Sequence, residues 1–274
     1  MLLLAATPIG NLADASARLI EVLGEAKYIA AEDTRTVLKL ANALDIKLNA
    51  KLFSLHEHNE AQRLDQILDI AENETVLVVS DAGMPTISDP GFLLVRAAVA
   101  KQIAVSVIPG PSAVLSALAV SGLPTDRFSF EGFIPRKQGE RNKFFSALIR
   151  ESRTMIFFES PHRILESLKD AATVFGGDRL ASVSRELTKK FEHTERGSLE
   201  QLCEWAKSEP KGEMVLVIAG AAEAAIDIED LVEQVKALTE EGVGLKEAVA
   251  EVASAAGASK GELYQLVLDS RKAR

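Results

Sequence analysis

The chain has 274 residues, 47% of them apolar and 26% charged, and its formal net charge is −9. This balance excludes large-scale disorder, and the length suits two α/β lobes with a small appendage. A single cysteine, Cys203, excludes an internal disulfide framework and a cysteine-rich zinc site. We expect a cytoplasmic protein without membrane contact, because no apolar run approaches the ~20 residues of a membrane span and the first residues lack a basic signal-peptide region.

The first part of the chain alternates between strand-like and helical patterns. Continuous apolar strands separated by amphipathic helices are typical of βαβ units, so we predict a parallel sheet in an N-terminal α/β domain at residues 1–122. The expected strands are 2–6, 28–31, 75–80 and 104–108, and the expected helices are 14–25, 34–44, 57–72 and 89–101.

A turn sequence at 121–124 ends this pattern and predicts the boundary to a second α/β domain at residues 123–222. Its sheet should be mixed, because the segments 180–185 and 190–196 are close enough to pair antiparallel. The other expected strands are 128–132, 154–159 and 214–219, and the expected helices are 139–150, 161–174 and 198–206.

Residues 223–274 should form a small C-terminal helical domain. Residues 245–269 have the spacing of a helix-turn-helix, with glycine in the turn. A plain helical hairpin that covers an apolar face would give the same pattern, so both interpretations stay open.

Charge is unevenly distributed along the chain. Residues 124–220 carry 16 basic and 15 acidic side chains, whereas residues 1–123 carry 9 and 14 and residues 221–274 carry 6 and 11. Bulk attraction therefore does not favour nucleic acid, but a polyanion would meet the middle segment, where Arg136 and Lys137 lie. An ordinary solvated surface is the alternative.

Three loops rich in glycine and proline directly follow expected strands, at 7–12, 81–91 and 109–113. Ligands of open parallel sheets bind beyond the carboxyl ends of the strands. Such loops would hold a ligand mainly through backbone groups, aided by the helix that begins after Pro111. The chain lacks the P-loop, the G-x-G-x-x-G fingerprint and the G-x-S-x-G elbow, which argues against those three classes of enzyme.

Polar residues form three further clusters. Glu32, Asp33 and Arg35 follow the second strand, where they could cap a helix or orient a hydroxyl or phosphate. His56, His58 and Asn59 follow a short apolar run; two histidines two residues apart are poor metal ligands on a helix, so we expect a substrate loop and no metal. In the third cluster Ser160 and Pro161 suit a helix start, which leaves Glu159, His162 and Arg163 for a site.

Nine strings together resemble the ribosomal RNA small subunit methyltransferase I family of the tetrapyrrole methylase superfamily. They are TPIGNL (7–12), AEDTR (31–35), HEHN (56–59), SDAGMPTISDPG (80–91), IPGPSA (108–113), GLPTDRFSFEGFIPRK (122–137), FFESPHR (157–163), SRELTKKFE (184–192) and GEMVLVI (212–218). One departure is Met84, where the family pattern has threonine, so any hydroxyl contact at this position is lost.

The resemblance implies two α/β domains with S-adenosylmethionine between them, usually in a homodimer. It also implies 2'-O-methylation of a cytidine in the decoding region of 16S rRNA within the small ribosomal subunit. The cofactor contacts implied are Pro8, Asp81, Ala82, Gly83, Ile87, Ser112, Ala113, Phe158, Leu187, Glu213 and Met214.

A ribose 2'-hydroxyl is a weak acid, so a general base should assist the transfer. The candidates are Glu32, Asp33, His58 and Glu159, and the sequence does not choose among them. The substrate contacts expected are Arg35, His56, Asn59, Arg136, Lys137, His162 and Arg163. Two rivals stay open: a methyltransferase acting on a small tetrapyrrole, and a non-catalytic ribosome-binding protein.

Overall fold

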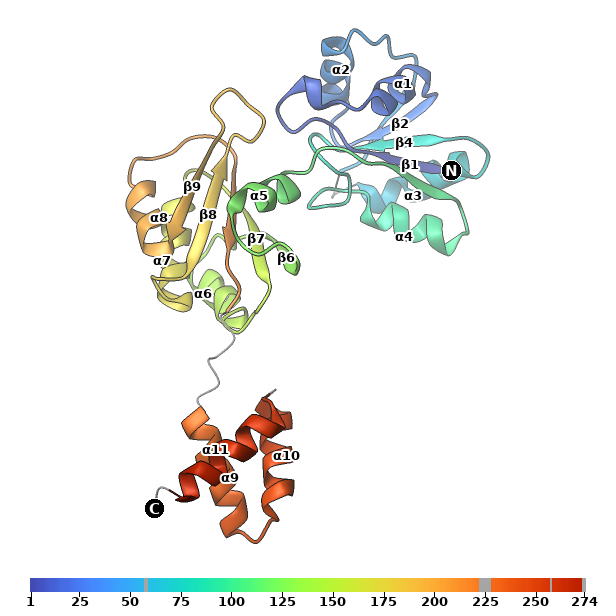
Figure 1. Ribbon diagram of the computed structural model, residues 1–274. Coiled ribbons are helices and arrows are strands. Elements are labelled where there is room, and N and C mark those ends of the chain that lie inside the picture. Colours follow the sequence, from blue (N-terminus) through green and yellow to red (C-terminus); the bar gives the residue numbers. More distant parts are fainter. Residues whose placement is uncertain (57–58, 222–227, 257, 273–274) are drawn as a thin grey trace. The chain divides into compact units, whose positions relative to one another are not determined.

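A computed structural model describes residues 1–56, 59–221, 228–256 and 258–272. The chain forms two compact units, Met1–Ala219 and Gly220–Arg274 (Figure 1). The expected boundary at residues 222–223 lies outside the described residues. The larger unit contains both sheets, and its division at residue 122 stays a prediction.

The first sheet has five parallel strands in the order β3-β2-β4-β1-β5, which confirms the parallel arrangement. The strands are β1 (Leu2–Ala5), β2 (Tyr28–Ala31), β3 (Lys51–Ser54), β4 (Val76–Val79) and β5 (Val105–Ile108). β3 was not expected: it is a four-residue edge strand in which only Phe53 is buried, so it lacks a continuous apolar run.

Four α-helices cover the two faces of this sheet, and the short 3-10 helix η1 (Leu12–Asp14) precedes them. The expected helix at 14–25 begins later, at Ala17, because the Ser16 side chain accepts a hydrogen bond from the Leu19 N–H and so caps the helix there. The helices are α1 (Ala17–Glu25), α2 (Thr34–Ala43), α3 (Glu60–Asn73) and α4 (Phe92–Ala100).

The second sheet has the order β6-β7-β10-β8-β9 and is mixed, as expected. β6 and β7 are parallel, and the other neighbours are antiparallel. The strands are β6 (Phe128–Phe133), β7 (Thr154–Glu159), β8 (Leu180–Arg185), β9 (His193–Ser198) and β10 (Met214–Ile218). β9 begins three residues later than expected, because the N–H of Lys189 and of Glu192 donate to backbone carbonyls in the turn after β8.

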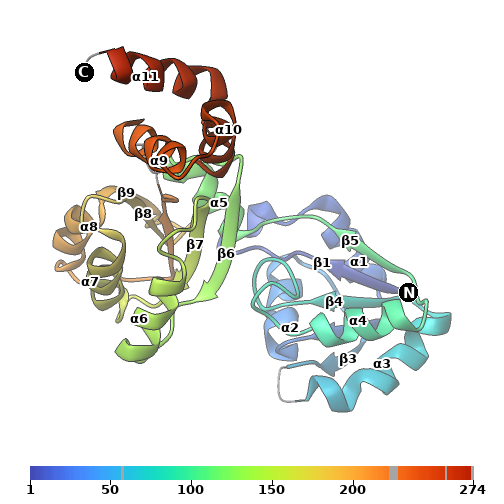
Figure 2. The ribbon, with the colours of Figure 1, turned by 90° about the horizontal axis from the view of Figure 1, so that it is seen from below.

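Three helices pack on one face of this sheet, α6 (Gln138–Ala147), α7 (Ile164–Phe175) and α8 (Leu199–Ala206), around a core that includes Phe145 and Phe157. The opposite face is covered by α5 (Ala113–Ser121), whose Val114 and Leu118 pack with Val217. Figure 2 shows α5 following β5. The chain therefore passes from the last strand of the first sheet directly into the helix that packs on the second sheet.

The smaller unit consists of α9 (Ile228–Glu240), α10 (Leu245–Ala256) and α11 (Lys260–Lys272). Val235, Val249 and Val267 lie in its core, so the helices expected in residues 245–269 share their apolar faces with a third helix. In the part of the chain that the structure describes, no helix is long and apolar enough to cross a membrane.

Candidate functional site

A cavity of about 1100 Å³ lies in the larger unit, lined by loops of both sheets. Nine of the eleven cofactor residues implied by the sequence line it, and the remaining two, Pro8 and Asp81, adjoin lining residues. The nine are Ala82, Gly83, Ile87, Ser112, Ala113, Phe158, Leu187, Glu213 and Met214.

Backbone contacts fix the loops of the first sheet at this cavity. The Thr7 N–H donates to the Gly83 carbonyl at 2.9 Å, and the Gly83 N–H donates back at 3.1 Å. Gly110 lies so near β1 that an added Cβ would be 2.9 Å from the Ala6 Cβ. Close backbone packing therefore requires glycine here, as expected for loops that present main-chain groups to a ligand.

The first loop touches the turn after β8 at the cavity, whose lining includes Ile9 and Leu187. A Cβ at Gly10 would lie 2.5 Å from the Lys189 Cγ and 3.0 Å from the Leu187 carbonyl oxygen. The Lys189 ammonium pairs with Glu186 at 3.1 Å and with Glu213 at 2.8 Å, which ties this turn to the residue before β10.

The loop from Asp81 to Gly91 is backbone-strained. Thr86 and Ser88 have φ values of 74° and 63°, a region that non-glycine residues seldom adopt. Glu60, only 5% exposed, holds the end of the loop, because its Oε1 accepts from the N–H of Gly91 at 3.1 Å and of Leu94 at 2.9 Å. Strain that the surroundings hold in place is typical of ligand-binding loops.

Two candidate bases, Glu32 and Asp33, lie at the carboxyl end of β2 beside the cavity loops and do not line the cavity. Glu32 accepts from the Asp81 N–H at 3.3 Å, and burial raises the pKa of Glu32. Asp33 caps α2 and pairs with Arg35 at 2.6 Å, and the Arg35 guanidinium lowers the pKa of Asp33 to about 2. The Asp33 carboxylate and the Arg35 guanidinium thus use each other as hydrogen-bond and charge partners.

Asp89 is a carboxylate that the sequence argument missed. It lines the cavity, is half-buried, and follows the strained residues of its loop. Burial, with the nearby negative charge of Glu32, raises the pKa of Asp89 to about 6. The string SDAGMPTISDPG contained this residue, but its raised pKa depends on its burial in the fold and on the charge of Glu32, which is distant in the sequence.

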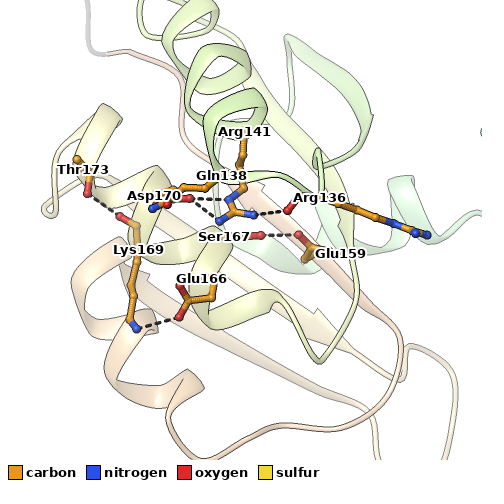
Figure 3. A network of polar contacts seen from close by, with 9 residues as sticks. All are labelled: Arg136, Gln138, Arg141, Glu159, Glu166, Ser167, Lys169, Asp170 and Thr173. Carbon is orange, nitrogen blue, oxygen red and sulfur yellow. Dashed lines mark hydrogen bonds and ion pairs between the residues drawn. The ribbon is translucent and has the colours of Figure 1, made fainter.

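Glu159 lines the cavity, yet its carboxylate already accepts hydrogen bonds from groups at the end of β7 and in α7. Its Oε1 accepts from the Ser160 N–H and from the Arg163 guanidinium. Its Oε2 accepts from the Ser167 hydroxyl at 2.5 Å (Figure 3). A carboxylate with both oxygens occupied and a fully buried side chain is suited to positioning Arg163 rather than to taking a proton from a substrate.

Three of the seven expected substrate residues line the cavity: Arg136, His162 and Arg163. The Arg163 Nη1 is buried and has no hydrogen-bond partner among the described residues, whereas its Nη2 also donates to the Ile134 carbonyl at 3.2 Å. Arg163 therefore retains a donor that a ligand could use.

The other expected substrate residues lie outside the cavity lining. Lys137 pairs with Glu140 at 3.1 Å on the surface, and Arg35 pairs with Asp33. The Asn59 side chain accepts from the His56 N–H at 2.9 Å and donates to the Ser54 carbonyl, which shapes the turn before α3. His58 lies outside the described residues. Among the residues that the structure describes, no group of three or more His, Cys, Asp or Glu could hold a metal ion.

The sequence matches the family model for tetrapyrrole (corrin/porphyrin) methylases over residues 1–203. Curated relatives named ribosomal RNA small subunit methyltransferase I match almost the whole chain. The protein from Mycobacterium tuberculosis (strain CDC 1551 / Oshkosh) is 48% identical over 99% of this chain and 95% of its own length. The protein from Escherichia coli O157:H7 is 42% identical over 97% and 93%.

Solved structures agree on the fold at much lower identity. The methyltransferase CobJ is 19% identical with a TM-score of 0.60, covering 81% of this chain and 94% of its own. Diphthine synthase is 16% identical with a TM-score of 0.57, covering 80% and 89%. By fold, family match and near-full-length relatives, the chain belongs to the tetrapyrrole methylase family and, within it, to the ribosomal RNA small subunit methyltransferase I group.

Proposed function

We propose that the protein transfers a methyl group from S-adenosylmethionine to the ribose 2'-hydroxyl of a cytidine in the decoding region of 16S rRNA, within the small ribosomal subunit. The observation that carries the proposal is the cavity, which the loops after β1, β4 and β5 line together with the second sheet. The names of the curated relatives support the substrate class.

The residues present fit the cofactor. Gly83, with a φ of 79°, lies in the cavity lining, and the close approach of Gly110 to Ala6 fixes the turn that leads to the lining residues Ser112 and Ala113. Asp89 in the lining and Glu32 near it supply negative charge, which suits a positively charged sulfonium. S-adenosylmethionine supplies the methyl group in an already activated form, so the reaction requires no metal.

The chain's own residues would orient the acceptor and receive its proton. Alignment of the attacking oxygen is worth roughly 7–11 kcal/mol at best. Asp89 is the best-placed proton acceptor, because Glu159 and Asp33 are committed to other partners. Arg136 and Arg163 would hold phosphate groups of the RNA.

Transfer of labelled methyl from S-adenosylmethionine to purified small ribosomal subunits tests this proposal. We expect label in 16S rRNA, on the ribose of a cytidine, and none in a porphyrinogen offered in parallel. Label in the porphyrinogen alone would support the tetrapyrrole rival. Binding to subunits without affinity for S-adenosylmethionine would support a non-catalytic ribosome-binding protein.

We further propose that the protein is a homodimer and works in the cytoplasm, where its ribosomal substrate is found. The edge strand β5 supports the homodimer, because Val105 and Val107 are 36% and 44% exposed there. An exposed apolar edge strand is a liability that proteins commonly cover. Residues 1–122 and 123–222 would act as the two lobes that enclose the cofactor.

A further inference from the structure

The aromatic ring of Phe133 is the most conspicuous unexplained group at the cavity. Phe133 lines the cavity at the end of β6, yet the residue is 62% exposed. Leaving a phenyl ring in water forgoes the free energy of burying it, so an uncovered ring in a cavity wall indicates a surface that a ligand covers.

A bulge in β6 sets the direction of this ring. Phe130 pairs with Ile156 and Phe133 pairs with Phe158, so three residues on β6 span two on β7. Gly132, with a φ of 75°, allows the extra residue. Since side chains alternate along a strand, Phe133 would otherwise face away from Phe130; the bulge brings both rings to the same face, against Phe158.

The Phe133 ring packs against Phe158 and yet stays largely exposed to solvent. Its centroid lies 5.3 Å from that of Phe158 in an edge-to-face arrangement, and Phe130 contacts Phe158 from 4.9 Å. The residues that follow are also anchored: the Arg163 guanidinium binds the Ile134 carbonyl at 3.2 Å, and the Arg141 guanidinium binds the Arg136 carbonyl at 3.2 Å. A preorganised ring loses little freedom when a ligand stacks on it.

A buried ion pair beneath the loop supports this rigidity. Arg141 pairs with Asp170 at 2.6 Å, and both side chains are almost fully buried. Figure 3 shows the Arg136 side chain directed away from this network, while its carbonyl faces Arg141. The Arg136 carbonyl is therefore anchored, and Arg136 lines the same cavity as Phe133.

Strand order separates Phe133 from the place where the Gly10 loop touches the second sheet. Along the sheet, β6 is followed by β7, β10 and β8, and the turn after β8 is the one that touches the Gly10 loop. Three strand spacings of about 4.8 Å separate β6 from β8 by roughly 14 Å. Phe133 thus stands apart from the contact between the Gly10 loop and this sheet.

Resting on the proposed function, we propose that Phe133 is the stacking platform for the base of the target nucleotide, with Arg136 beside it on the RNA backbone. Proteins that read unpaired RNA stack splayed bases on aromatic rings next to cationic side chains. The bulge at Gly132 and the anchored loop after it are the devices that present this ring.

The test compares Phe133→Ala, Phe133→Trp and Phe128→Ala in the full-length protein. Phe128 is the matched control, because it lies on the same strand, is 38% exposed and is outside the cavity lining. Stacking strengths predict that Phe133→Ala lowers kcat/KM for small ribosomal subunits roughly 5- to 150-fold. Phe133→Trp should restore most of the loss, and Phe128→Ala should match the wild type.

Calorimetric affinity for S-adenosylmethionine separates the outcomes. An unchanged Kd in Phe133→Ala, with the loss confined to the RNA substrate, supports the platform. An equal loss of cofactor affinity would assign the ring to the cofactor and overturn the inference, as would wild-type kcat/KM. If the wild type itself transferred no methyl group to the subunits, the proposed function would fail instead.

Discussion

At the scale of single residues, neighbouring carboxylates of one sheet edge have opposite environments. The Arg35 guanidinium lowers the pKa of Asp33 to about 2, whereas burial raises the pKa of Asp89 to about 6. Asp33 is therefore always ionised near neutral pH, and Asp89 can exchange a proton there. Carboxylates whose environments separate their pKa values are a frequent sign of divided roles in an active site.

Asp89→Asn tests this difference through both activity and stability. Loss of a proton acceptor should lower kcat by roughly 10²- to 10⁴-fold. A carboxylate whose pKa is raised in the folded state destabilises that state once ionised, so its penalty appears as pH rises from about 4 to about 6. The variant should therefore melt above the wild type at pH 7.5 and close to it at pH 4.

Asp33→Asn is a control that should change the melting temperature at pH 7.5 in the opposite direction. Its lowered pKa stabilises the folded protein above pH ~4, so the variant should melt slightly below the wild type at pH 7.5. Asp89→Asn could instead melt below the wild type at pH 7.5 and keep the wild-type kcat. Ionised Asp89 would then not destabilise the folded state, and Asp89 would not be the proton acceptor.

The Arg141–Asp170 pair gives a second prediction at this scale. Removing one partner of a buried pair leaves an uncompensated charge, so Arg141→Met should lower the free energy of unfolding by about 3–5 kcal/mol. Lys207→Met, which breaks an exposed pair with Glu204, should cost ~1 kcal/mol or less. Urea unfolding measures both, and similar losses in the two variants would contradict the structural role of Arg141.

At the scale of elements, most strands and helices could be predicted because apolar runs and amphipathic patterns mark them. β3 was not predicted, because Phe53 is its only buried residue and one buried residue gives no recognisable strand pattern. The loops that line the cavity were found from their glycines and prolines and from the family strings. Phe133 was missed because the bulge at Gly132 interrupts the two-residue alternation on which the interpretation of a strand depends.

The turn from β5 to α5 makes a prediction about elements. Gly110→Ala would place a Cβ 2.9 Å from the Ala6 Cβ, so β1 or the turn must shift. We expect S-adenosylmethionine affinity to fall at least about tenfold, which corresponds to about 1.4 kcal/mol.

Gly139→Ala in α6 is the matched control, since nothing lies within 4 Å of the added Cβ. It should leave the affinity unchanged and, because Gly139 is an exposed helical position, stabilise the protein by up to about 1 kcal/mol. Calorimetry measures the S-adenosylmethionine affinity of both variants. Equal affinities would show that the close packing of Gly110 does not shape the proposed cofactor site.

At the scale of the whole molecule, the homodimer proposal predicts the sedimentation behaviour. The wild type should sediment at twice the chain mass of 29.5 kDa. Val107→Asp, which places a charge on the exposed face of β5, should shift it toward the monomer. Val99→Asp, which puts the same charge on an exposed position of α4, should remain dimeric. A monomeric wild type, or a dimeric Val107→Asp variant, would refute the role of β5.

The arrangement of the two sheets would allow an acidic chain to act on RNA, as we propose. Net charge favours repulsion, but the second sheet and its loops carry Arg136 and Arg163 to one cavity. Recognition would then depend on a few placed cations and an aromatic ring rather than on overall charge, with affinity that falls as salt rises.

A crystal structure of the full-length protein with S-adenosylhomocysteine would show whether the cavity between the loops of the two sheets holds the methyl donor. The ligand should contact the backbone at Gly83 and Ala113 and lie against Leu187 and Met214, with Phe133 uncovered. A ligand bound elsewhere on the protein, or one whose adenine covers Phe133, would overturn this assignment of the cavity.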